Sequence, residues 1–308
     1  MSPLINVNDS SNPNIVGSHK PIIGILAQEA HSVRHLYPNE IVHSYIAASY
    51  VKFVESAGGR VLPIRIGQNR EYYKNIVDKT NGLMLPGGAA LFGTNSGFSE
   101  AGQYLYDIAL ECNQNNDFYP IWAICLGMEL MIQTSLSGKE IRSQCNSRKK
   151  SLPLILKPDI NTSRLFCNVP DTILQILRSE NVTANSHRYC FTEKTFQKYN
   201  LLQEWRVLST NYDDNGLEFI SSYEHTTLPF YGVQFHPEKN AFEFEPHYEH
   251  GGNAVIAAQY FGNFFIDECR KNKHEIDEQL RDELIYKYVP RYSGSIGSIY
   301  EQIYLFDE

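Results

Sequence analysis

Short apolar runs alternate with amphipathic stretches along the first half of the chain. Four runs that are apolar on both faces predict buried strands of a parallel sheet, at 21–26, 61–64, 82–85 and 119–124. Hydrophobic residues at helical spacing predict helices between and after them, at 45–57, 72–79, 102–113 and 126–133. This alternation predicts an α/β domain whose parallel sheet is covered on both faces.

The pattern changes after Ser135. Short β-rich segments predict an added, partly antiparallel layer, at 152–156, 182–185, 206–209 and 218–221. A further buried strand is predicted at 230–235 and a long amphipathic helix at 253–270. The chain has no internal repeat and no linker rich in Pro, Gly or Ser. We therefore expect a flexible tail over residues 1–20 and a single domain over 21–308, with the apolar C-terminal extension packed on its body.

Composition narrows the classes of partner. The chain has 308 residues, of which 42% are hydrophobic, and this is ample material for a buried core. Its net charge of −8 argues against nucleic acid and against an anionic membrane surface, because both partners require a basic patch. No apolar run reaches the length that is needed to span a membrane.

Six cysteines stand singly along the chain. They are Cys112, Cys125, Cys145, Cys167, Cys190 and Cys269. The absence of a Cys-x-x-Cys pair and of zinc-finger spacing predicts that there is no structural metal site. Six cysteines are too few for a disulfide scaffold in a chain of this length. They indicate one reactive thiol among inert ones, with room for one or two disulfides.

Three Asn-x-Ser/Thr sequons occur, at Asn8, Asn161 and Asn181. Together with a polar N-terminal segment they fit a secreted chain whose signal peptide has been removed. They fit a cytosolic chain almost as well, so the residues alone leave the compartment open.

One cysteine lies where a strand turns abruptly into a helix. The buried run 119–124 ends at Cys125, and a helix is predicted to begin at Leu126, with Gly127 supplying the small residue that a tight turn needs. We expect the helix N-terminus to favour the thiolate at this position. A free cysteine is more often an inert core residue, so the role of Cys125 depends on its partners.

A candidate base follows the predicted strand 230–235. His236 and Glu238 are two residues apart, so in extended chain both side chains leave on one face, and Pro237 disfavours a helix between them. A carboxylate beside an imidazole fixes its tautomer and stabilises the imidazolium that forms when a thiol is deprotonated. Alone, this segment also suits an ordinary exposed turn.

A glycine pair follows the buried run 82–85. In Pro86-Gly87-Gly88 the backbone is free to turn its N–H groups towards a ligand, as an oxyanion hole requires. The Gly88 and Leu126 amides are the expected pair of donors. A plain β-turn is the alternative for such a segment taken by itself.

In combination, these motifs resemble the class I glutamine amidotransferase fold and, more narrowly, the γ-glutamyl hydrolase family of cysteine peptidases. The resemblance rests on the segments 21–26, 45–58, 86–88, 125–127, 183–185, 232–239 and 284–307, and so covers almost the whole chain after residue 20. It implies a flavodoxin-like three-layer sandwich with a mostly parallel central sheet and an added, partly antiparallel layer.

The resemblance also implies a reaction. The family hydrolyses γ-linked glutamate in folyl and antifolyl poly-γ-glutamates, which makes Cys125 the nucleophile that forms a thioester, His236 the proton carrier and Glu238 its orienting partner. No cofactor is implied. By the same resemblance Glu129, His187 and Tyr50 are substrate-binding residues. Each of the three residues also has a purely structural interpretation. Glu129 could simply be a first-turn helix residue favoured by the helix dipole, His187 a surface loop residue and Tyr50 a core aromatic.

The resemblance implies a homodimer and a lysosomal, vacuolar or extracellular location, although the chain shows no signal peptide. Two departures stand out: Ala123 replaces a glycine that is usual in the elbow, and Tyr189 replaces a tryptophan. Two other functions remain open, a glutaminase that hands ammonia to a synthase and a silent binding protein of the same fold. No synthase domain is present in this sequence, and the joint presence of Cys125, His236 and Glu238 disfavours the binding protein.

Overall fold

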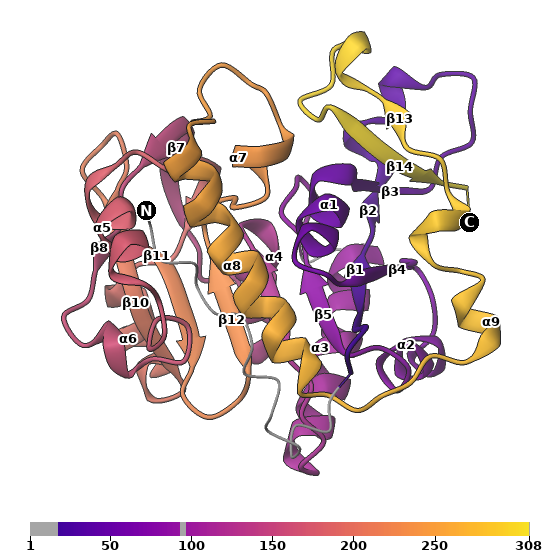
Figure 1. Ribbon diagram of the computed structural model, residues 1–308, viewed down its shortest axis with the longest axis horizontal. Coiled ribbons are helices and arrows are strands. Elements are labelled where there is room, and N and C mark those ends of the chain that lie inside the picture. The colour runs from indigo at the N-terminus through magenta and orange to yellow at the C-terminus, as the bar shows by residue number, and fades with distance from the viewer. Residues whose placement is uncertain (1–17, 93–96, 308) are drawn as a thin grey trace, which may run out of the picture.

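The computed structural model describes residues 18–92 and 97–307 and is built on an eight-stranded sheet (Figure 1). The strand order is β4-β1-β5-β6-β12-β11-β10-β8, and the first five strands run parallel. The other three pair antiparallel. The bounds are β4 Arg60–Ile64, β1 Ile22–Leu26, β5 Gly82–Leu85, β6 Ile121–Ile124, β12 Phe230–Val233, β11 Glu218–His225, β10 Trp205–Tyr212 and β8 Ile155–Leu156.

Helices cover both faces of this sheet (Figure 1). One layer contains α1 (Ala48–Ser56), α5 (Asp171–Ser179) and α8 (Gly252–Arg270), and the other contains α2 (Arg70–Val77), α3 (Gly97–Gln114) and α4 (Leu126–Ser135). Three further helices are short: α6 Glu193–Lys198, α7 Lys239–Phe242 and α9 Glu278–Arg281. The predicted α/β class, with a mostly parallel central sheet and added antiparallel strands, is confirmed.

Aromatic packing fixes α8 across the centre of the sheet. Trp122 on β6 is fully buried, and its ring stacks on Phe265 of α8 with 5.9 Å between centroids. Tyr231 on the neighbouring strand β12 donates a hydrogen bond to Glu268 of the same helix at 2.9 Å. None of the described helices is long and apolar enough to cross a membrane.

Two smaller sheets flank the central one. The first has the order β13-β14-β3-β2, with bounds β13 Arg291–Tyr292, β14 Gln302–Phe306, β3 Ser44–Ala47 and β2 Gln28–Glu29. The second, here called the β7–β9 ribbon, pairs β7 (Ser143–Leu152) with β9 (Thr183–Cys190) antiparallel. In the first sheet the C-terminal strand β14 pairs with β3. The single domain over 21–308 stays a prediction, and residues 1–17 of the predicted tail lie outside the described residues.

Two predicted elements differ from the structure. The helix expected at 45–57 begins only at Ala48, because residues 44–47 form strand β3. Tyr45 there pairs with Leu305 on one side and with Gln28 on the other, so long-range backbone pairing overrides the helical spacing. The strand expected at 152–156 is divided between the end of β7 and β8, whereas the segment expected at 182–185 is present as the start of β9 in the antiparallel ribbon.

Candidate active site

The carboxyl ends of β5, β6 and β12 meet at one edge of the sheet, because these three parallel strands are direct neighbours. Gly87 follows β5, Cys125 follows β6 directly, and His236 lies shortly after β12. A Cβ atom added to Gly87 would lie 2.6 Å from Cε1 of His236, 2.8 Å from the Tyr50 hydroxyl and 3.1 Å from Cβ of Cys125. The fold therefore brings Cys125, His236 and Tyr50 together around a position that has room only for glycine.

Cys125 occupies a strained turn between β6 and α4. Its backbone angles are φ 48° and ψ −108°, in a region that L-residues rarely adopt. Its N–H donates to the Val233 carbonyl at 2.8 Å, and its own carbonyl accepts the first helical hydrogen bond from Glu129 at 3.0 Å. A Cβ at Gly127 would lie 2.0 Å from the Leu85 carbonyl oxygen, so only glycine fits there. This is the layout of a nucleophile elbow.

Burial dominates the electrostatics of the Cys125 thiol. Burial raises the pKa of Cys125, and the nearby Glu129 carboxyl adds to the effect. The Leu126 N–H and the Lys239 ammonium lower this pKa but do not offset the burial. A helix N-terminus was expected to favour the thiolate here. Its contribution has the expected sign, yet the larger desolvation cost keeps the thiol protonated at rest, so its ionisation requires a base.

His236 is held by a carboxylate on one side of its ring. Nδ1 of His236 lies 2.7 Å from Oε1 of Glu238 and 3.5 Å from the Tyr50 hydroxyl. Because an ionised carboxylate only accepts, this contact places the proton on Nδ1 and leaves Nε2 free of a proton. Burial lowers the pKa of His236, although Glu238 opposes that effect. A neutral imidazole with an unprotonated Nε2 is the form that acts as a base.

The contact between His236 and Glu238 arises from a turn and not from extended chain. Strand β12 ends at Val233, two residues earlier than expected, and Glu238 has the helical angles φ −68° and ψ −18° that lead into α7. The expectation of an extended segment here is wrong. The two side chains meet because the turn around Pro237 folds the carboxylate back towards the ring.

A second carboxyl group lies near the thiol. Nε2 of Gln234 is 3.7 Å from Sγ of Cys125 and donates to Oε1 of Glu129 at 3.1 Å. Burial raises the pKa of Glu129 to about 7, against the opposing charge of Arg142. Gln234 was not among the residues predicted for the site. Its position directly after a buried strand, at the same sheet edge as Cys125, was the available signal.

Arg142 completes the surroundings of Glu129. Its Nη1 donates to Oε2 of Glu129 at 2.8 Å, and its guanidinium lies over the rings of Phe92 and Tyr189, at 4.1 Å and 4.7 Å from their centroids. It also forms a forked ion pair with Glu140. Sequence reasoning missed Arg142, because nothing in the local pattern connects it with residues on α4 and β9.

Lys239 is a third residue that the sequence analysis passed over. Its side chain is buried, and Nζ donates to the Tyr248 hydroxyl at 2.8 Å. Its positive charge lowers the pKa values of both Cys125 and His236. Its place directly after Glu238 in the sequence was the signal that could have found it.

Three predicted residues remain: Gly88 after β5, Leu126 at the start of α4, and His187 on β9. A Cβ at Gly88 would lie 1.7 Å from Oε1 of Gln28, and Nε2 of Gln28 donates to the Gly87 carbonyl at 2.5 Å. Leu126 opens helix α4. His187, in contrast, donates from Nδ1 to the Tyr189 carbonyl at 2.9 Å and packs its ring edge-on against Phe219 at 4.9 Å. These contacts lie within β9 and with β11, His187 also lowers the pKa of Cys145 on β7, and its substrate role stays a prediction.

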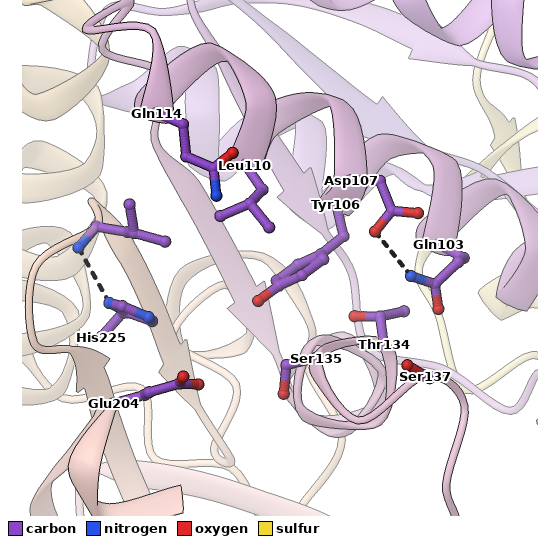
Figure 2. Close-up of a pocket in the computed structure, with 11 residues that line it drawn as sticks. Gln103, Tyr106, Asp107, Leu110, Gln114, Thr134, Ser135, Ser137, Glu204 and His225 are labelled. Carbon is purple, nitrogen blue, oxygen red and sulfur yellow. Dashed lines mark hydrogen bonds between the residues drawn. The ribbon is translucent and has the colours of Figure 1, made fainter.

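A hollow of about 660 Å³ lies at the C-terminal end of α4, whereas Cys125 precedes the first residue of that helix. Figure 2 shows the side chains that line this hollow. Thr134 and Ser135 at the end of that helix line it together with Tyr106, Asp107 and His225. Within 18–92 and 97–307, no group of three or more His, Cys, Asp or Glu side chains is arranged to hold a metal ion.

Comparison with known proteins gives a consistent result. The family model for Peptidase C26 matches residues 21–238. The chain is 39% identical to the γ-glutamyl hydrolase of Rattus norvegicus over 295 residues, covering 94% of this chain and 91% of that protein. It is 35% identical to the human γ-glutamyl hydrolase over 302 residues, covering 96% and 93%, and 35% identical to γ-glutamyl hydrolase B of Dictyostelium discoideum, covering 94% and 84%.

Among solved structures, the chain is similar to a glutamine amidotransferase from Methylobacillus flagellatus, with 11% identity, a TM-score of 0.49, and coverage of 85% of this chain and 98% of that one. The family model covers more than half of the chain, and the curated relatives exceed 30% identity over nearly all of it. The chain therefore belongs to the γ-glutamyl hydrolase family, Peptidase C26.

Proposed function

We propose that this protein hydrolyses γ-glutamyl amide bonds in folyl and antifolyl poly-γ-glutamates, with Cys125 as its nucleophile. The observation that carries the proposal is the grouping of the Cys125 thiol and the His236 ring around Gly87, with Glu238 fixing the ring. The curated relatives, which are named γ-glutamyl hydrolases, support the same bond class.

The reaction begins with a proton transfer. Nε2 of His236 accepts the thiol proton as Sγ of Cys125 attacks the γ-carbonyl carbon, and Glu238 stabilises the imidazolium that forms. The low resting acidity of the Cys125 thiol makes this base necessary. The N–H groups of Leu126 and Gly88 are the proposed donors to the oxyanion of the tetrahedral intermediate.

The thioester forms when the intermediate collapses. His236 returns its proton to the departing α-amine, and the remaining γ-glutamyl group stays bound to the Cys125 sulfur. His236 then takes a proton from water, which attacks the thioester carbonyl and releases the γ-carboxylate. The proton held by His236 restores the thiol, so that the two half-reactions use one base.

Substrate contacts are proposed for three residues. Tyr50 reaches the same space beside Gly87 as the nucleophile and base, and this supports its hydroxyl as a contact to the γ-glutamyl group. Gln234 contacts both the Cys125 thiol and the Glu129 carboxyl group. Glu129 is therefore proposed to bind a polar group of the γ-glutamyl residue of the substrate. His187 on β9 is the third proposed contact, on the resemblance alone.

We further propose a homodimer in the lysosome or vacuole or outside the cell, with glycan on the chain. Asn161 and Asn181 are both exposed, which a glycan requires, whereas Asn8 lies outside the described residues. Sedimentation analysis tests the homodimer, and the mass change on treatment with an amide-cleaving glycosidase tests the glycan. Both measurements are independent of the chemistry.

The decisive experiment incubates the purified chain with a pteroyl penta-γ-glutamate and identifies the products by mass. Release of glutamate or of γ-glutamyl chains is the expected result, together with its loss in Cys125→Ala. Free glutamine is the parallel substrate: ammonia from glutamine without cleavage of the polyglutamate would favour a glutaminase. Turnover of neither substrate by a folded chain would favour a binding protein and overturn the proposal.

A further inference from the structure

A pair of thiols lies in the β7–β9 ribbon, in addition to the single thiol of Cys125. Cys145 on β7 and Cys190 on β9 are both buried and pack together with Phe219 of β11 in a small apolar cluster. Ser143 lies directly opposite Cys190, and the register shifts between Gln144 and Ser147, where Cys145 stands. The irregular pairing thus places two cysteines from different strands side by side.

The two thiols influence each other's ionisation. The neighbouring Cys190 thiol and the His187 ring lower the pKa of Cys145, although burial opposes this. The same pairing and burial raise the pKa of Cys190. By contrast, burial raises the pKa values of Cys112, Cys125 and Cys269.

The hydrogen bonding of His187 explains its effect on the thiol. Its Nδ1 proton is used by the Tyr189 carbonyl, so the neutral ring has an unprotonated Nε2. That atom is buried and has no hydrogen-bond partner among the described residues. The His187 ring and the Cys145 thiol both pack against Phe219, so this nitrogen is available to accept a hydrogen bond from the thiol.

We propose that Cys145 and Cys190 form a reversible disulfide that closes the β7–β9 ribbon, with Cys145 as the attacking thiolate and Cys190 as the resolving thiol. The oxidant is a small-molecule disulfide. Cys145 attacks one of its sulfur atoms, the bond between the two sulfurs breaks, and one thiolate leaves. Cys190 then attacks the Cys145 sulfur, loses its proton to solvent and expels the second thiolate.

Electrons balance in this exchange, because the two protein thiols lose two electrons and the small disulfide gains them. The order of attack follows from exposure, since Cys145 is 7% exposed and Cys190 is fully buried. The bond would join β7, which begins directly after Arg142, to β9, which carries both His187 and Tyr189. The inference does not depend on which substrate the protein cleaves.

The test uses the full chain, equilibrated with glutathione disulfide and separately with reduced glutathione. Each sample is denatured in acid, its free thiols are alkylated, and the unreduced digest is mapped by mass spectrometry. We expect a peptide pair joined through residues 145 and 190 in the oxidised sample only. We also expect a Tm that is about 3–8 °C higher in that sample, because a cross-link restricts the unfolded chain.

Three variants sharpen the outcome. Cys190→Ala should hold glutathione on Cys145 as a mixed disulfide, because the resolving thiol is gone, and Cys145→Ser should show neither species. The matched control is Cys167→Ser, which removes an exposed cysteine outside the ribbon and should leave the cross-link intact. Full alkylation of Cys145 and Cys190 in the oxidised wild-type chain, or a cross-link to another cysteine, would overturn the proposal even if a variant failed to fold.

Discussion

Nη1 of Arg142 lies 2.8 Å from Oε2 of Glu129, and both side chains are largely shielded from solvent, at 12% and 4% exposure. The guanidinium is the counter-ion of a carboxyl group that is connected through Gln234 to the Cys125 thiol. Burial nevertheless raises the pKa of Glu129 to about 7, so its charge changes near neutral pH. Arg142 therefore influences the charge beside the proposed nucleophile without contacting it.

Replacing Arg142 tests that influence directly. In Arg142→Met the opposing charge is lost, so the pKa of Glu129 should rise above 7, and stability should fall by about 1–3 kcal/mol because buried polar groups lose a partner. The carboxyl ¹³C resonance of Glu129, assigned with Glu129→Gln, reports the titration. Arg142→Lys keeps the charge and should retain most of the wild-type behaviour; an unchanged Glu129 titration in Arg142→Met would contradict the assignment.

Glu129→Gln should make stability less sensitive to rising pH. The folded-state pKa is raised, so the stability that the protonated carboxyl contributes is present below its unfolded pKa, near 4.5, and is lost as pH rises through about 7. Urea unfolding at pH 5 and pH 8 should show the variant gaining up to about 3 kcal/mol over the wild type between these values.

The matched control for that experiment is Glu140→Gln. The pKa of Glu140 is lowered by its hydrogen bonds and ion pair with Arg142, although burial opposes this, so the stability it contributes is present above its unfolded pKa. Its removal should therefore not produce a gain with rising pH. If both variants gave the same trend, the raised pKa of Glu129 would be refuted.

The acid limb of the activity profile should lie below pH 6.5. Burial lowers the pKa of His236, so the neutral base persists as pH falls through the ordinary histidine range, and kcat/KM should decline only below it. A wild-type profile that declines above pH 6.5 with a single histidine-like pKa would contradict this expectation.

Glu238→Gln should reduce kcat by about 10²–10⁴-fold, because an amide no longer fixes the proton on Nδ1 and no longer stabilises the imidazolium. Steady-state kinetics measures the loss, and an unchanged Tm would show that the fold is retained. Glu275→Gln, an exposed change of the same chemistry, is the control and should leave kcat unaltered. Wild-type turnover by Glu238→Gln would remove this carboxylate from the mechanism.

Gly127→Ala should disrupt the elbow. The added methyl group would lie 2.0 Å from the Leu85 carbonyl oxygen, so α4 or β5 must move, at a cost of about 1–3 kcal/mol. Gly252→Ala meets no atom within 4 Å and should change stability by less than about 0.5 kcal/mol. Chemical unfolding compares the two, and equal stabilities would show that the turn at Cys125 does not require glycine.

Local pattern alone was enough for much of the fold. Runs apolar on both faces predicted β1, β4, β5 and β6, and the helical spacing between them predicted α2 and α3, because a doubly covered parallel sheet imposes these patterns on the sequence itself. The same reasoning located Cys125 at a strand-to-helix turn, and parallel strands then bring their carboxyl ends to one edge.

Contacts between distant segments decided the rest. Tyr45 lies in a strand because β2 and β14 pair with it, and Arg142 reaches Glu129 because the chain before β7 folds over α4. The acidity of Cys125 was also set by the tertiary structure, since the helix N-terminus is visible in the sequence whereas burial is not. Sequence determines which groups are present in each element, but the desolvation and pairing that tune them exist only once the elements have packed.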